Sequence, residues 1–153
     1  MTTLTTTYNW FSKAVPKPTK TNIAVQIGVH FEEVQEFILA LLKQAPDELI
    51  NNLEHASFAV KDLSTLLKSG EYVFNDGLEE STEALDAIVD QVVTATGVAY
   101  MCGWDANGAV KEVNRSNYSK FDINGNAIFN STGKIMKSDL YSPPNLTPYI
   151  NLG

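Results

Sequence analysis

Two clusters of acidic side chains lie about fifty residues apart, each inside a stretch of chain that is otherwise apolar. The first comprises Glu32, Glu33 and Glu36, and the second comprises Glu83, Asp86 and Asp90. On a helix the first set spans an arc of roughly 100° and the second an arc of roughly 60°. A helix that is apolar around most of its circumference is usually buried. The pattern therefore predicts two long helices whose carboxylates interrupt apolar, buried faces.

Local positive charge is too scarce to neutralise these carboxylates. Residues 32–105 contain fifteen acidic residues, but only Lys43, Lys61 and Lys68 are basic. A buried carboxylate without a partner is strongly destabilising. A divalent cation such as Mg²⁺ or Mn²⁺, which prefers oxygen ligands, would compensate and could hold a polyphosphate. The alternative is that an acidic chain of net charge −7 simply presents solvated acidic faces.

A separate basic segment follows the acidic part of the chain. Five of the eleven basic residues fall within 27 positions that contain only two acids, and these five are Lys111, Arg115, Lys120, Lys134 and Lys137. Lysine and arginine bind phosphate oxygens. Together with an acidic metal centre, the segment indicates a nucleoside triphosphate as the partner. A solvated loop with scattered lysines is the alternative.

Bulk properties restrict the class of protein. A chain of 153 residues with 44% hydrophobic content is expected to form one domain with a core. The pI near 4.7 argues against a partner that is polymeric nucleic acid. We expect no membrane span and no secretion signal. The single cysteine, Cys102, indicates a reducing compartment, so we expect a cytoplasmic protein.

The hydrophobic periodicity, together with residues that cap or end helices, predicts four main helices. The sequence contains no internal repeat. Thr21 or Asn22 can cap the first helix, and Gly70 and Gly103 can end the second and third. The expected ranges are 21 or 22 to 43, 47–69, 78–102 and 106–116.

The two ends of the chain have a different character. Residues 1–20 are rich in threonine and contain two prolines, which predicts an irregular arm with at most a helical turn near Trp10. Residues 117–153 predict an extended tail that wraps over the helices or over a neighbouring subunit. Asn124-Gly125 within this tail predicts a hairpin or turn.

These segments resemble the all-α nucleotide pyrophosphohydrolases of the MazG-like and phosphoribosyl-ATP pyrophosphohydrolase superfamily, over about residues 20–147. The resemblance lies in HFEEVQEF at 30–37, EALDAIVD at 83–90 and GVAYMCG at 97–103. The segments EVNRSNYSKF at 112–121, GKIMK at 133–137 and YSPPNL at 141–146 are most similar to phage-encoded members.

The resemblance implies a fold, an activity and an assembly. The fold is a helical bundle, all-α, completed by oligomerisation as a dimer or as a tetramer that is a dimer of dimers. The activity is Mg²⁺- or Mn²⁺-dependent hydrolysis of a nucleoside triphosphate between its α and β phosphates, which gives a monophosphate and pyrophosphate. A phage-encoded member would act in the host cytoplasm.

The resemblance also implies roles for individual residues. Glu33, Glu36, Glu83 and Asp86 match metal ligands, and Asp90 matches a second carboxylate one turn later. Glu32 matches a ligand or a base that orients the attacking water. Contacts to phosphate or sugar are implied for Arg115, Asn117, Lys120, Lys134 and Lys137.

The identity of the substrate remains open between alternatives. Asn9 and Trp10 are candidates for contacting the base, although Trp10 could equally be a core aromatic. Similar phage enzymes act on dGTP, which favours a purine, and guanine over adenine. The alternatives are hydrolysis of phosphoribosyl-ATP and a non-catalytic acidic helical protein that binds a partner.

Overall fold

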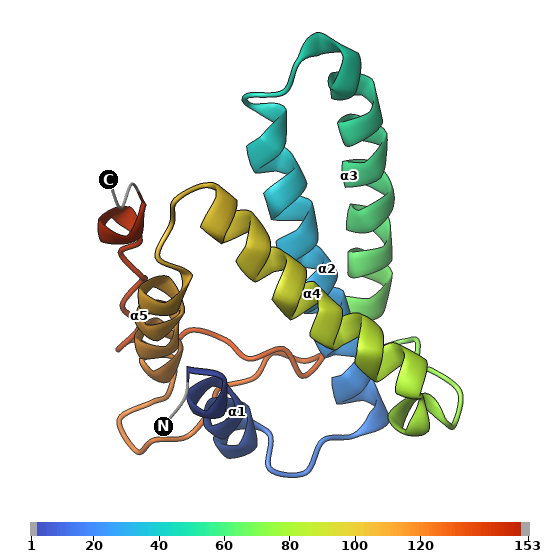
Figure 1. Cartoon of the computed structure of the whole chain (residues 1–153). Helices are drawn as coiled ribbons and strands as arrows, with labels where there is room; N and C mark the ends of the chain where they lie inside the picture. The colour runs from blue at the N-terminus through green and yellow to red at the C-terminus, as the bar shows by residue number, and fades with distance from the viewer. Residues whose placement is uncertain (1–2, 151–153) are drawn as a thin grey trace. The chain divides into compact units, whose positions relative to one another are not determined.

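A computed structural model describes residues 3–150, which form helices and contain no β-strand (Figure 1). This confirms the predicted all-α class. The elements in chain order are α1 (Thr3–Ala14), α2 (Lys20–Leu42), α3 (Asp47–Lys68), η1 (Leu78–Glu80), α4 (Thr82–Met101), α5 (Ala106–Tyr118) and η2 (Thr147–Tyr149). None of the helices in this range is both long enough and apolar enough to cross a lipid bilayer.

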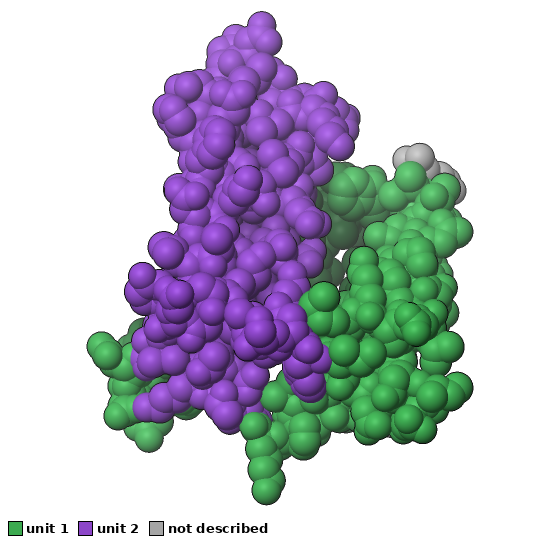
Figure 2. Space-filling view, turned by 180° about the vertical axis from the view of Figure 1, so that it is seen from behind, with its two compact units in different colours: residues 1–17, 75–128, 135–153 green, residues 18–74, 129–134 purple. Residues whose placement is uncertain are grey.

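The chain divides into two compact units, coloured separately in Figure 2. The first unit contains residues 1–17, 75–128 and 135–153, and the second contains residues 18–74 and 129–134. Each unit is described below by itself. That the whole chain forms a single MazG-like domain stays a prediction.

The second unit is a helical hairpin in which α2 and α3 pack along one another (Figure 1). The helices approach closely at Gly28, where an added Cβ would lie 2.9 Å from the Leu67 Cβ. Ser64 donates a 2.7 Å hydrogen bond to the backbone oxygen of Gly28. Small residues at this crossing therefore set the distance between the two helices.

The start of α2 differs from the prediction by a few residues. Thr19, rather than Thr21 or Asn22, is the N-cap, and its side chain accepts a hydrogen bond from the backbone N–H of Asn22. The Asn22 side chain accepts from the backbone N–H of Thr19 in return. The interaction is a capping box in which asparagine replaces the usual glutamate or glutamine.

The first unit contains a small aromatic core between α1 and the end of α5. Trp10, Ala14 and Phe121 are buried there, and Phe11 packs with its ring centre 4.7 Å from that of Trp10. The predicted irregular arm at residues 1–20 is therefore wrong for residues 3–14, which form α1. Burial of two of its residues stabilises a helix whose threonine-rich sequence has low intrinsic propensity.

Most of the predicted tail is extended, but its first two residues belong to α5, which ends at Tyr118, and η2 forms at Thr147–Tyr149. In the first unit the tail is attached to α5: the Ser142 N–H donates to the Ser119 hydroxyl at 2.8 Å, and the Ser138 hydroxyl donates to the Phe121 backbone oxygen at 2.9 Å. The expected turn at Asn124-Gly125 is present, and Gly125 adopts a φ of 78°. The last three residues of the predicted tail, and the first two of the predicted arm, lie outside the described residues.

The burial expected for the second acidic helix is not found in the single chain. No residue of α4 is buried, and Leu85 and Val93 are 64% and 62% exposed. The predicted range of 78–102 is also interrupted, because η1 ends at Glu80 and Ser81 caps a new helix. One chain thus leaves the apolar surface of α4 largely uncovered.

Candidate functional site

The first acidic cluster forms an ion-pair network in the second unit. The two carboxylate oxygens of Glu32 lie 2.7 Å from the Lys68 ammonium and 2.8 Å from the Lys134 ammonium. These three side chains come from the middle of α2, the last residue of α3 and the turn at 129–134. The network joins segments that are 36 and 102 residues apart in the sequence.

The lysines control the protonation of Glu32. Partial burial acts to raise the pKa of this carboxyl, but hydrogen bonds and charge from Lys134 and Lys68 outweigh it and lower the pKa below its ordinary value. A general base is most effective when its pKa lies near the working pH. In this unit Glu32 holds two lysines, and its expected role as a metal ligand or as a base that orients water stays a prediction.

The other two carboxylates of this cluster face solvent. Glu33 and Glu36 are both exposed on α2. Residues four apart on a helix are neighbours on one face, so Glu36 lies one turn from Glu32. The second unit thus places an exposed carboxylate one helical turn from the carboxylate that binds the two lysines.

The second acidic cluster belongs to the first unit. Glu83, Asp86 and Asp90 are all exposed on α4, and Glu83 accepts a 3.3 Å hydrogen bond from the Ser81 hydroxyl. Within residues 3–150, no three histidine, cysteine, aspartate or glutamate side chains form a group that could hold a metal. Convergence of the α2 and α4 carboxylates on a metal therefore stays a prediction.

The arginine of the basic segment is engaged by its own helix. Arg115 binds Glu112 through two hydrogen bonds of 2.9 and 2.8 Å, and it also donates to the backbone oxygen of Pro143 at 3.0 Å. Hydrogen bonds from Arg115, and next from the Asn145 N–H, lower the pKa of Glu112 to about 2. The pair anchors the tail to α5, a role that the sequence does not reveal.

Three other predicted phosphate contacts also have local partners in the first unit. The Lys120 ammonium lies 5.5 Å from the centre of the Trp10 ring, and that of Lys137 lies 4.5 Å from the centre of the Tyr141 ring. The backbone oxygen of Asn117 accepts a hydrogen bond from the Trp10 indole. Lys120 and Asn117 thus contact the aromatic core through Trp10, whereas Lys137 contacts a ring of the tail, and a phosphate role for all three stays a prediction.

Trp10 is not placed to stack on a base. Its side chain is only 4% exposed, and its indole N–H is already bonded to Asn117. A stacking platform needs a free ring face, so this burial supports the alternative that Trp10 is a core aromatic, and a base contact by Trp10 stays a prediction. Asn9 is exposed on the same helix.

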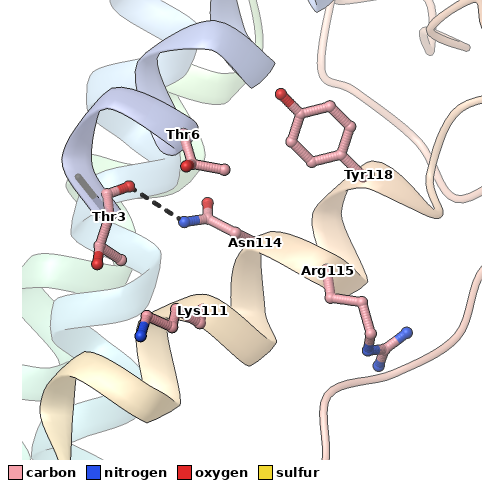
Figure 3. Close-up of a pocket in the computed structure, with 6 residues that line it drawn as sticks. All are labelled: Thr3, Thr6, Lys111, Asn114, Arg115 and Tyr118. Atoms are coloured by element: carbon pink, nitrogen blue, oxygen red, sulfur yellow. Dashed lines mark hydrogen bonds between the residues drawn. The ribbon is translucent and has the colours of Figure 1, made fainter. Parts of the chain in front are cut away.

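A pocket of about 410 Å³ opens between α1 and α5 (Figure 3). Its lining is Thr3, Thr6, Lys111, Asn114, Arg115 and Tyr118. The Asn114 amide, shown at the centre of Figure 3, donates to the Thr3 backbone oxygen at 3.3 Å and accepts from Thr7. The pocket is cationic, but its buried amide is used to join the two helices.

Comparison with known proteins adds no assignment. No protein-family model, no curated protein and no solved structure matches this chain.

Proposed function

We propose that this protein is a metal-dependent diphosphohydrolase of nucleoside or deoxynucleoside triphosphates. It cleaves between the α and β phosphates and releases a monophosphate and pyrophosphate. Purine nucleotides are preferred, with guanine favoured over adenine. The observation that carries the proposal is the Glu32 network, because it holds two lysines against one carboxylate of the EExxE segment, and Glu36 of the same segment lies one helical turn from that carboxylate.

The chemistry of the side chains fits both parts of a metal-bound polyphosphate. Exposed carboxylates at Glu33 and Glu36, and at Glu83, Asp86 and Asp90, offer the oxygen ligands that Mg²⁺ and Mn²⁺ prefer. When bound, such an ion polarises a phosphate and lowers the pKa of a coordinated water. Lys134, the lysine of the network that the sequence pattern already marks as a phosphate contact, binds phosphate oxygens and neutralises their charge.

The exposed surface of α4 supports assembly of this enzyme. Leu85, Val89 and Val93 recur at helical spacing and are each more than half exposed. Water contact with such a stripe is unfavourable, so a second copy of the chain is expected to cover it. Assembly as a dimer or a dimer of dimers would also shelter the acidic side chains of the same helix.

The test is a panel of all ribonucleoside and deoxyribonucleoside triphosphates with Mg²⁺ or Mn²⁺, scored for monophosphate and pyrophosphate. We expect pyrophosphate release that is greatest with guanine nucleotides. Glu36→Gln should lose turnover and keep the fold, whereas Glu54→Gln, the same change on the exposed surface of α3, should match the wild type.

Each possible result of this panel supports or refutes one part of the proposal. No pyrophosphate from any nucleotide would refute the enzyme and favour an acidic helical binding protein. Turnover of phosphoribosyl-ATP alone would favour that alternative substrate. Equal rates with all bases would remove the guanine preference, and an unchanged Glu36→Gln variant would refute the assignment of the site.

A further inference from the structure

The Glu32 network contains one more cation than its carboxylate requires. Lys68 and Lys134 each bind a different oxygen of Glu32, and the three side chains carry a net charge of +1. Lys68 joins α3 to α2 and Lys134 joins the turn at 129–134 to α2, so the same contacts that link the three segments also gather excess positive charge. The second lysine is notable in a chain whose overall charge is −7.

The fold brings Lys68 to this position through the close helix crossing. An added Cβ on Gly28 would lie 2.9 Å from the Lys68 Cγ, so the lysine stem passes directly over the α2 backbone. Lys68 is also the last residue of α3, where the helix dipole favours a cation. Packing and electrostatics thus direct its ammonium to Glu32.

A hydrogen-bonded turn holds Lys134. The Asn130 side-chain oxygen accepts hydrogen bonds from the backbone N–H groups of Thr132 and Lys134, at 3.0 and 2.8 Å. Gly133 completes this turn with a φ of 86°. The turn therefore presents its lysine from a fixed backbone.

Both ammonium groups retain donors for a ligand. An ammonium has three N–H groups, and within residues 3–150 the ammonium groups of Lys68 and Lys134 have no hydrogen-bond or ion-pair partner other than Glu32. The side chains of Lys68 and Lys134 are 21% and 34% exposed, so an anion can reach them. Two partly desolvated cations held by one carboxylate are preorganised to bind phosphate oxygens.

We propose that Lys68 is a further substrate-binding residue, which Glu32 holds beside Lys134 so that the two ammonium groups bind the pyrophosphate portion of the nucleotide. This proposal rests on the proposed function and deepens it. Glu32 is then a positioning residue for two lysines.

The experiment measures binding of inorganic pyrophosphate by calorimetry in the presence of Mg²⁺, together with the KM for the best nucleotide. Lys68→Met should weaken pyrophosphate binding by about tenfold or more and raise KM by a similar factor, because a charge-assisted hydrogen bond is lost. Lys68→Arg should bind pyrophosphate nearly as well as the wild type. Lys61→Met, which changes an exposed lysine two turns earlier on α3, is the matched control and should leave both values unchanged.

The outcomes separate this inference from the proposed function. Unchanged pyrophosphate affinity in a folded Lys68→Met variant, with only a lower melting temperature, would overturn the inference and leave the hydrolase standing. Lys68-dependent pyrophosphate binding by a wild-type protein that hydrolyses no nucleotide would keep the anion site and refute the hydrolase. If Lys68→Met does not fold, Lys68→Gln is measured in its place, with the same expectation.

Discussion

The indole N–H of Trp10 donates a 2.7 Å hydrogen bond to the backbone carbonyl of Asn117, 107 residues later in the chain. This bond ties α1 to the last turn of α5 at the centre of the aromatic core. The same carbonyl also accepts from the Lys120 N–H at 3.1 Å. The segment that follows α5 is therefore held in place from both the α1 side and its own turn.

Replacing Trp10 by phenylalanine should destabilise the protein without changing its affinity for nucleotides. The variant loses the indole hydrogen bond and leaves a small cavity, which together cost about 1–3 kcal/mol. Urea unfolding measures the loss of stability, and KM measures substrate binding. Tyr8→Ala, on the exposed face of α1, should change stability by less than about 0.5 kcal/mol. A raised KM with unchanged stability would restore Trp10 as a base-contacting residue.

Glu112 should make stability depend on pH in the acid range. Its folded-state pKa of about 2 lies below the ordinary value of 4.5, so its stabilising contribution is complete above about pH 4.5. That contribution is lost as the pH falls from about 4.5 towards 2. The melting temperature of Glu112→Gln should thus lie below that of the wild type at pH 6, and the gap should narrow by pH 3. Glu54→Gln is the control for the change of charge, and a gap that is constant with pH would contradict the assignment.

Gly28→Ala should destabilise the α2–α3 hairpin. The new methyl group would lie 2.9 Å from the Leu67 Cβ and 3.0 Å from the Lys68 backbone nitrogen, so the helices must separate at a cost of about 1–3 kcal/mol. Gly97→Ala on α4 is the control, because its methyl group would meet nothing within 4 Å. Removing a helical glycine there should stabilise by about 0.5–1 kcal/mol. Chemical unfolding measures the stability of both variants. Equal decreases in their free energy of unfolding would show that the close helix crossing does not cause the destabilisation.

Helices were predictable where the sequence has both a hydrophobic periodicity and residues that cap or end a helix. The predicted second helix, 47–69, agrees with α3 at Asp47–Lys68, and Gly70 follows it with a φ of 78°. The missed helix, α1, has neither signal. It forms because Trp10 and Ala14 are buried against Phe121. The pattern of a single sequence cannot reveal a contact between residues more than a hundred positions apart.

The candidate site was predictable only in its residue types. The carboxylates of α2 and Lys134 were identified from the sequence, but Lys68 was not, because its partner Glu32 lies 36 residues away on another helix. Likewise, the sequence shows Glu112 only as one of two acids in the basic segment, whereas in the structure it accepts hydrogen bonds from Arg115 and from the Asn145 N–H. Pairings of this kind depend on tertiary packing, which local spacing does not encode.

A charge introduced on the apolar surface of α4 should dissociate the assembly. If a second copy covers this surface, Val93→Glu buries an unpaired carboxylate at the contact, which costs several kcal/mol and favours the monomer. Sedimentation velocity should show a dimer or tetramer for the wild type and a monomer for Val93→Glu. Asn51→Glu adds the same charge to the exposed face of α3 and should leave the assembly intact. A monomeric wild type, or an undisturbed Val93→Glu oligomer, would mean that α4 remains exposed to solvent and that its carboxylates are not sheltered by a partner subunit.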